Sequence, residues 1–303
     1  MRLGNGRRST RLQAPAKINL GLHVLGTLSD GTHSVATIYQ AVDLFDDVEL
    51  ALVDEGVRIS VHGQRREGVP DGEDNLAAQA AQVLLEAAGV DRGVEIRLTK
   101  RIPPAAGLGG GSSDAAAVLR GLTDLLGLGM SLDDLAELAA GLGADVPFFL
   151  YGGTAFGYHH GSHLLALRPP PSLAGLIVVP DVQVSTFWAY HAWDLEARKH
   201  PPAAGSRWRR ADLDVQNLAA CRNDFEPLVF AKFPEIESLH RTLIEGSPVV
   251  ARVSGTGSAC FALYPDGERR DREADRLRDA YRNRPEYGIF RVRFFSGGVE
   301  ALD

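Results

Sequence analysis

Residues 103–119 read PPAAGLGGGSSDAAAVL, a glycine-rich loop between an expected strand and an expected helix. Before the loop, apolar and polar residues alternate over 94–99, which predicts a half-buried strand. After it, apolar residues recur at helical spacing over 115–126. Glycines let backbone N–H groups approach a ligand, and the start of a helix adds unpaired N–H groups and a partial positive charge. The stretch therefore predicts an anion site, and phosphate is the usual occupant of such a site.

Two common phosphate-binding loops do not fit these glycines. A Walker A loop ends in Gly-Lys-Ser or Gly-Lys-Thr, and no lysine follows the glycines here. A dinucleotide fingerprint needs a third glycine where Ser112 stands, and an acidic residue about 20 residues on at the end of a second parallel strand. A glycine-rich turn without a ligand is the structural alternative. Three adjacent glycines would be a costly way to build an ordinary turn.

Composition places the 303 residues among ordinary soluble globular proteins, with 45% hydrophobic and 23% charged residues. The length favours two domains. No run approaches the roughly 18 apolar residues that a membrane helix needs. The net charge of −7 argues against general nucleic-acid binding, although a local group of amides and lysines can still hold an anion. Cys221 and Cys260 form no C-x-x-C pair, which favours a reducing, cytoplasmic location.

Strands and helices alternate without a regular βαβ repeat, which favours an α+β fold over a doubly wound sheet. The first 13 residues are expected to form a flexible leader. Glycines and prolines over 151–171 mark the expected change of domain, and a polar, proline-containing stretch is expected at 194–212. Strands are expected at 16–24, 48–53, 57–61, 94–98, 176–179, 259–264 and 290–295, and helices at 75–88, 115–126, 132–142, 224–232 and 268–282.

Several segments resemble the motifs of the GHMP kinases. The glycine loop resembles the second motif of that family, APAKINLGLHV at 14–24 the first, and SGTGSACFALY at 254–264 the third. LGADVPFFLYGGTAFG at 142–157 resembles the segment of the catalytic aspartate, and EDNLAAQAA at 73–81 the helix on the nucleotide side. Matches in the expected order over most of the chain are far more specific than one glycine loop.

The resemblance implies an α+β, two-domain GHMP kinase fold. An N-terminal ATP-binding domain of the ribosomal-protein-S5-domain-2-like kind would span 1–162, and a ferredoxin-like α/β domain 163–303. It implies ATP as phosphoryl donor, with Mg²⁺ bound to the nucleotide, and a small-molecule acceptor. The motifs are most similar to those of the member that acts on a cytidyl diphosphate sugar alcohol. We expect a cytoplasmic monomer or weak homodimer without nucleic-acid or membrane partners.

The resemblance places Lys17 and Asp145 at the reacting hydroxyl. Phosphoryl transfer passes through a loose transition state, so positioning and charge stabilisation dominate catalysis. Asp145 would accept the hydroxyl proton late in the transfer, while Lys17 would hold the aspartate ionised and stabilise negative charge. Spacing alone favours other interpretations, because Asp145 precedes Pro147 as a helix N-cap does and Lys17 could be a strand lysine that reaches solvent. The joint motif favours catalysis for both.

On the nucleotide side, the resemblance implies that the whole loop wraps the phosphates. Asn75 and Lys100 are implied at the adenosine end, although Lys100 could equally be a solvated residue at a strand end. Ser112 or Ser113 would bring a hydroxyl near Mg²⁺, and no dedicated carboxylate cage is expected for this ion. The expected loop contacts are Pro103, Pro104, Ala105, Ala106, Gly107, Leu108, Gly109, Gly110, Gly111, Ser112 and Ser113.

For the acceptor, the segment DGTH at 30–33 resembles one whose tyrosine stacks on cytosine and whose histidine binds it. His33 is retained, whereas Thr32 cannot stack. Tyr190 falls where a second stacking aromatic is expected. Base–aromatic stacking is worth roughly 1–3 kcal/mol per base, so the loss of one ring weakens binding without abolishing it.

Thr186 and Asn19 resemble residues that line the sugar-alcohol end of the acceptor. Thr186 could instead be a turn hydroxyl, and Asn19 a hydrogen-bonded residue of a strand. Two other functions stay open. The chain could phosphorylate another small alcohol, homoserine-like or isoprenoid, as Thr32 suggests. It could also be a nucleotide-binding protein without catalysis, which the retained Lys17 and Asp145 argue against.

His159, His160 and His163 form an H-H-x-x-H pattern in a glycine-rich segment. No helix is expected to converge them, and no cysteine or carboxylate stands close by in the sequence. We therefore expect no functional metal there. The run ERRDREADRLRDAYR at 268–282 is typical of a solvated helix with mixed-charge pairs.

Overall fold

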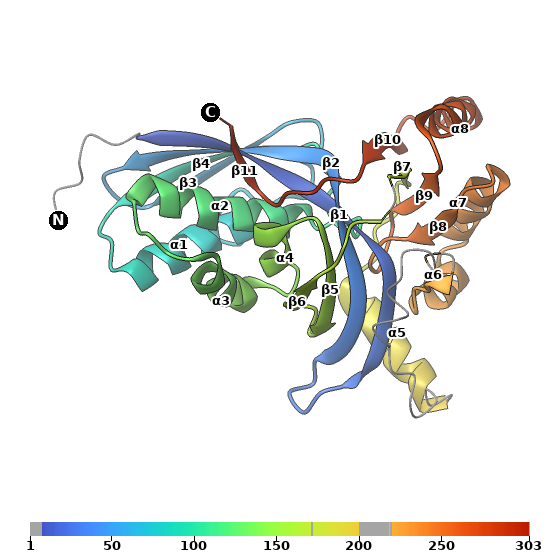
Figure 1. Cartoon of the computed structure of the whole chain (residues 1–303), viewed down its shortest axis with the longest axis horizontal. Coiled ribbons are helices and arrows are strands. Elements are labelled where there is room, and N and C mark those ends of the chain that lie inside the picture. Colours follow the sequence, from blue (N-terminus) through green and yellow to red (C-terminus); the bar gives the residue numbers. More distant parts are fainter. Residues whose placement is uncertain (1–7, 171, 200–217, 219, 303) are drawn as a thin grey trace.

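The computed structural model describes residues 8–170, 172–199, 218 and 220–302 (Figure 1). Seven strands form the larger of two sheets, in the order β11-β1-β2-β4-β3, with β5 paired to β2 and β6 to β5. Neighbouring strands are antiparallel except β3 and β4. The strands are β1 (Ser9–Thr27), β2 (His33–Val53), β3 (Val57–His62), β4 (Gly93–Thr99), β5 (Thr154–His159), β6 (His163–Ala166) and β11 (Glu300–Leu302).

Four helices cover one face of this sheet (Figure 1). The first begins after Asn75, whose side chain accepts a hydrogen bond from the N–H of Ala77, and it ends at Gly89 in the left-handed conformation. The third begins after Ser131, which forms a capping box with Asp134. These helices are α1 (Leu76–Ala88), α2 (Gly110–Leu126), α3 (Leu132–Leu142) and α4 (Val146–Tyr151).

The smaller sheet has four antiparallel strands in the order β10-β7-β9-β8. Strand β10, the last of the four in the chain, lies beside β7, the first. Helices connect β7 to β8 and β9 to β10, which is the ferredoxin-like arrangement. This confirms the expected α+β class and the ferredoxin-like second half. The elements are β7 (Ala174–Val179), α5 (Thr186–Lys199), α6 (Glu226–Lys232), α7 (Pro234–Glu245), β8 (Val250–Val253), β9 (Cys260–Tyr264), α8 (Gly267–Ala280) and β10 (Gly288–Arg293).

Strands β1 and β2 are unusually long and join the two halves of the molecule. Their pairing shifts register at three points, between Pro15 and Ala16 and near Asn19 and Val24. Such irregularities bend a ribbon and increase its twist. Past the second of these points, Leu22 packs in the hydrophobic cluster of the smaller sheet, and the N–H of Val24 donates to Asp224 at 2.9 Å. The ribbon therefore begins in one core and ends in the other.

The last residues of the chain return to the larger sheet, as the red segment in Figure 1 shows. The N–H of Val299 donates to the carbonyl of Phe149 at 2.8 Å, and β11 pairs with β1. The boundary expected between 162 and 163 stays a prediction. Strands β6 and β11 both join the larger sheet from beyond it. Within the described part of the chain, no helix has the length and apolarity to cross a membrane.

The flexible leader expected over the first 13 residues is wrong from Ser9 onward. These residues form the start of β1 and pair with both β2 and β11, and Leu12 is fully buried. The sequence of residues 9–13 is too polar to predict a strand by itself. Strands β2 and β11 stabilise it as a strand through their hydrogen bonds. Residues 1–7 of the leader and 200–212 of the polar stretch expected at 194–212 lie outside the described residues, whereas 194–199 forms the end of α5.

We predict that Gly152→Ala destabilises the protein far more than Gly127→Ala. Both glycines have left-handed φ, at +68° and +62°. A Cβ at Gly152 would lie 1.9 Å from the carbonyl oxygen of Gly297, whereas one at Gly127 would meet nothing within 4 Å. The control should lose about 1 kcal/mol through strain alone, and Gly152→Ala more than about 3 kcal/mol. Urea unfolding followed by circular dichroism measures both, and equal losses would contradict the close packing of the C-terminal segment.

Candidate active site

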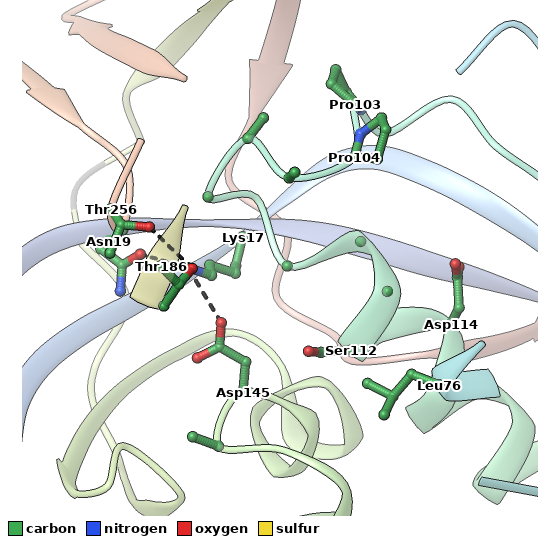
Figure 2. Close-up of a pocket in the computed structure, with 18 of the residues that line it drawn as sticks. Lys17, Asn19, Leu76, Pro103, Pro104, Ser112, Asp114, Asp145, Thr186 and Thr256 are labelled. Carbon is green, nitrogen blue, oxygen red and sulfur yellow. Dashed lines mark hydrogen bonds and ion pairs between the residues drawn. The ribbon is translucent and has the colours of Figure 1, made fainter. Parts of the chain in front are cut away.

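A cavity of about 620 Å³ opens where the two halves of the molecule meet (Figure 2). The larger sheet and its helices supply Lys17, the glycine loop and Asp145, and the smaller half supplies Thr186 and Thr256. Figure 2 shows Lys17, Asp145 and Thr186 at one end of the cavity, with Ser112, Asp114 and Leu76 toward the other. The predicted phosphate loop and the predicted catalytic pair therefore share one cavity.

The glycine loop is held by backbone contacts from both halves. The N–H of Lys17 donates to the carbonyl of Leu108 at 3.0 Å, and the hydroxyl of Ser254 donates to the carbonyl of Gly107 at 2.8 Å. A Cβ at Gly107 would lie only 2.1 Å from the carbonyl oxygen of Ser254, and φ there is +78°. Only glycine fits this position, so the close approach explains one of the glycines.

Helix α2 begins at Gly110, and the preceding Gly109 offers no side chain to cap it. The N–H groups of the first turn therefore have no partner within the helix, and three of its residues, Gly110, Gly111 and Ser112, line the cavity. Unpaired N–H groups and the positive end of the helix dipole together attract an anion. The geometry expected for a phosphate site is present.

Two of the expected loop residues, Leu108 and Ser113, keep their side chains away from the cavity, and their backbone contacts with phosphate stay predictions. Leu108 is buried in a hydrophobic cluster, and Ser113 is fully buried with its N–H bonded to Gly109. The helix begins at Gly110, ahead of the expected 115–126, and Ser113 lies on its buried side. The remaining loop residues that line the cavity are Pro103, Pro104, Ala105, Ala106, Gly107, Gly109, Gly110, Gly111 and Ser112.

Lys17 and Asp145 lie side by side at the end of the cavity. The Nζ atom of Lys17 is 3.5 Å from Oδ2 of Asp145 and donates to Oδ1 of Asn19 at 2.6 Å. Lys17 is 3% exposed, so the interpretation as a lysine that reaches solvent is wrong. Asp145 stands at the N-cap of α4, but its side chain makes no capping hydrogen bond. The carboxylate therefore faces the cavity and the lysine.

A third group holds the carboxylate. The hydroxyl of Tyr39 donates to Oδ1 of Asp145 at 2.8 Å. Burial, with the charge of Asp145 adding to it, raises the pKa of Tyr39 well above its usual value of 10.0, so the hydroxyl stays protonated. Nothing in the family motifs marked this residue. A signal exists in the strand pairing, because Tyr39 stands directly opposite Asn19 on the ribbon.

Lys100 lies in a buried cluster with Asp46 and Asp114, and its Nζ atom donates to both carboxylates. It is 2% exposed, so the alternative of a solvated lysine is wrong. It lines the cavity, and its contact with the adenosine end stays a prediction. The N–H of Ile102 donates to the second oxygen of Asp46 at 2.9 Å, so the cluster also fixes the chain before the glycine loop.

Burial dominates the electrostatics of this cluster. It raises the pKa of Asp46, and it raises that of Asp114 to about 7, against the opposing effect of Lys100. Burial alone would lower the pKa of Lys100, but the two carboxylates outweigh it and the pKa is raised. Among the described residues, the second oxygen of Asp114 has no hydrogen-bond partner. Two carboxyl groups thus share one lysine beside the cavity.

A second cavity of about 500 Å³ adjoins the first, because Thr186, Tyr190 and His160 line both. There His33 stacks on Tyr190 with ring centroids 4.5 Å apart, and its Nε2 atom is 2.8 Å from Oδ1 of Asp194. The structure therefore brings together His33 and Tyr190, which lie 157 positions apart in the sequence. Aromatic and polar groups make this cavity suitable for a planar base.

The remaining predicted residues occupy the walls of these cavities. Asn19 also donates to Thr37 at 2.7 Å, and Asn75 lines the first cavity while its amide donates to the carbonyl of Pro70 at 2.6 Å. Thr186 begins α5, and its hydroxyl is 3.4 Å from that of Thr256. Thr186 therefore belongs to a helix facing both cavities, and not to an isolated turn.

Thr32, which stands where the resemblance implies a stacking tyrosine, contacts a histidine. The Oγ1 atom of Thr32 is 3.0 Å from Nε2 of His160 and bonds to Asp30. His159 packs 4.2 Å from His160 and 5.2 Å from His163, measured between ring centroids. Within the described ranges, no group of three or more His, Cys, Asp or Glu side chains could hold a metal ion.

Comparison with known proteins agrees with this geometry. A model of the N-terminal domain of GHMP kinases matches residues 75–153, and a model of the GHMP kinase C-terminal domain matches 211–283. The 4-diphosphocytidyl-2-C-methyl-D-erythritol kinase of Geobacter metallireducens is 41% identical over 263 residues, which cover 86% of this chain and 91% of that protein. The kinase of the same name from Moorella thermoacetica is 39% identical, covering 89% and 95%.

Solved structures extend the comparison. A crystal structure of 4-(cytidine 5'-diphospho)-2C-methyl-D-erythritol kinase has a TM-score of 0.73 and 33% identity, and the match covers 96% of this chain and 97% of that one. Homoserine kinase from Cytophaga hutchinsonii has a TM-score of 0.77 at 21% identity and shares the fold. The chain belongs to the GHMP kinase family. Its curated relatives within the family are named 4-diphosphocytidyl-2-C-methyl-D-erythritol kinase.

We predict that Asp114→Asn becomes more stable relative to the wild type as pH rises from 5 to 8. The folded pKa of about 7 exceeds the usual aspartate value of 3.8, so the folded protein binds more protons between these values. Wild-type stability from this group is therefore lost as pH rises through that window. The amide has no charge to bury and should not show this loss.

Urea unfolding at both pH values measures the difference. Asp124→Asn on the same helix is the control, because the side chain of Asp124 is 56% exposed. A difference between Asp114→Asn and the wild type that does not change with pH would contradict the buried-carboxyl account.

Proposed function

We propose that this chain transfers the γ-phosphate of ATP to the 2-hydroxyl of 4-diphosphocytidyl-2-C-methyl-D-erythritol, in the non-mevalonate pathway to isoprenoid precursors. The relatives with that name support the substrate. The observation that carries the proposal is the position of Lys17 and Asp145, which line the cavity of the phosphate loop within reach of the second cavity at Thr186 and Tyr190. ATP would then occupy the first cavity and the acceptor the second, with the catalytic pair between them.

The phosphates of ATP would lie on the N–H groups at the start of α2, with Gly107 allowing the loop to close around them. The acceptor hydroxyl would lie between the γ-phosphate and Asp145, which takes its proton late in the transfer. Lys17 is buried and donates to Asn19, so its ammonium is held beside the carboxylate and the developing negative charge. Preorganised charge of this kind lowers the barrier without moving during the reaction.

Mg²⁺ is expected with the nucleotide, and the hydroxyl of Ser112 on the cavity wall is an oxygen donor that suits it. Ser113 does not qualify, because its side chain is buried away from the cavity. Bound there with the nucleotide, the ion would neutralise charge on the phosphates. The remaining coordination would come from phosphate oxygens and water, as is usual for Mg²⁺.

The second cavity would take the cytosine of the acceptor. Tyr190 offers a ring face that already stacks on His33, and Asp194 fixes the histidine by its hydrogen bond. Stacking of a base on an aromatic side chain contributes about 1–3 kcal/mol. Asn19 and Thr186 would line the path from the base to the reacting hydroxyl. Each of these contacts is a prediction for the complex.

Another GHMP kinase acceptor is the second candidate, and Thr32 is the observation that favours it. The threonine hydroxyl bonds to Asp30 and contacts His160, so this side of the cavity is polar where an aromatic ring was expected. A homoserine-like or isoprenoid alcohol would not need a base-stacking wall.

We further propose a cytoplasmic enzyme that acts as a monomer or weak homodimer without nucleic-acid or membrane partners.

We predict that Asp145→Asn lowers turnover by about 10²–10⁴-fold, because the proton acceptor is lost. ADP release is measured with 4-diphosphocytidyl-2-C-methyl-D-erythritol, homoserine and mevalonate as acceptors. Asp124→Asn, an exposed aspartate on α2, is the matched control and should keep wild-type turnover. Wild-type activity on another alcohol but not on the cytidyl compound would refute the substrate. Unchanged turnover in Asp145→Asn would refute the mechanism.

A further inference from the structure

Two different side chains hold the two oxygens of the Asp145 carboxylate. The hydroxyl of Tyr39 donates to Oδ1 at 2.8 Å, and Nζ of Lys17 is 3.5 Å from Oδ2. Asp145 is the N-cap residue of α4, but its carboxylate accepts no capping hydrogen bond from the described N–H groups of that helix. The direction in which the carboxylate faces is therefore set by Tyr39 and Lys17 together.

Tyr39 is itself rigidly placed. It is 3% exposed, and its ring stacks on Phe148 of α4 with centroids 4.9 Å apart. The hairpin of β5 and β6 leaves a slot for this ring. A Cβ at Gly157 would lie 2.5 Å from the ring carbon Cε2, and one at Gly161 would lie 2.7 Å from the hydroxyl. Two glycines and an aromatic contact thus fix the hydroxyl at the carboxylate.

The hydroxyl serves as a donor throughout the neutral range. Burial and the nearby charge of Asp145 raise the pKa of Tyr39 well above 10.0. The charged or titratable groups around this carboxylate come from three elements: Lys17 on β1, Tyr39 on β2 and Tyr190 on α5. Of these, Tyr39 and Lys17 make the direct contacts with Asp145.

We propose that Tyr39 is a positioning residue for phosphoryl transfer, which occupies Oδ1 of Asp145 so that Oδ2 receives the acceptor proton beside Lys17. The inference rests on the proposed function of the pair. In the step, the acceptor oxygen bonds to the γ-phosphorus while the bond from phosphorus to the bridging oxygen of ADP breaks. The hydroxyl proton passes to Oδ2, and ADP leaves with the electron pair of the broken bond.

Tyr39→Phe is the direct test, because phenylalanine keeps the ring in its slot and removes only the hydroxyl. The expected result is a fall in kcat of about 10-fold, corresponding to one hydrogen bond to a charged group, with KM for ATP and acceptor unchanged. Tyr264→Phe is the matched control. Its hydroxyl is buried in β9 of the smaller sheet and has no partner among the described residues, so kcat should not change.

A double-variant comparison separates positioning from a structural role. Rates are measured in single-turnover experiments on Asp145→Asn and on Asp145→Asn combined with Tyr39→Phe. If Tyr39 acts through the carboxylate, adding Tyr39→Phe causes less than a 2-fold further loss. A further loss as large as that in the wild-type background, or an unchanged kcat in Tyr39→Phe alone, overturns the proposal.

A second variant displaces the hydroxyl without removing it. Gly161→Ala places a Cβ against the hydroxyl of Tyr39 and should reproduce the fall in kcat with unchanged KM. Gly56→Ala is its control, because it has a similar left-handed φ and nothing within 4 Å. If Tyr39→Phe folds poorly, Gly161→Ala alone decides: a normal kcat in that variant overturns the proposal. Wild-type protein inactive on every acceptor would instead refute the proposed function.

Discussion

The pairing of β1 with β2 is the constraint on which the rest of the site depends. The ribbon passes from one core to the other, and its bends occur where it carries Lys17 and Asn19 on one strand and Tyr39 on the other. Because side chains on paired strands are fixed by register, a slip of one residue would turn Lys17 away from Asp145. The same ribbon carries His33 to Tyr190 at its far end. Its register therefore positions both the catalytic pair and the proposed acceptor site.

Charge is distributed unevenly around the cavity. The start of α2 supplies unpaired N–H groups for an anion, while Lys100 is engaged by Asp46 and Asp114. These carboxylates hold Lys100 against the cost of burial, and hydrogen bonds from the backbone before the loop tie that loop to the larger sheet. Contacts that position the loop before a ligand binds reduce the ordering that binding requires.

Local sequence patterns predicted the elements with strong periodicity or caps, such as α1 between Asn75 and Gly89. They missed the start of β1, whose polar residues form a strand only because β2 and β11 pair with them. In the site, the joint motifs found Lys17 and Asp145, whose spacing alone favoured other roles. The solvated alternative for Lys100 was wrong because its partners stand 54 and 14 positions away. No motif marked Tyr39, since its role arises from strand register and packing.

The most direct test of the account is a crystal structure with a non-hydrolysable ATP analogue and 4-diphosphocytidyl-2-C-methyl-D-erythritol bound together. The account predicts the γ-phosphate on the N–H groups of 110–112 and the 2-hydroxyl about 3 Å from Oδ2 of Asp145, in line with the γ-phosphorus. It also predicts the cytosine against Tyr190. Triphosphate bound elsewhere, or a 2-hydroxyl turned away from Asp145 with both ligands at full occupancy, would contradict it.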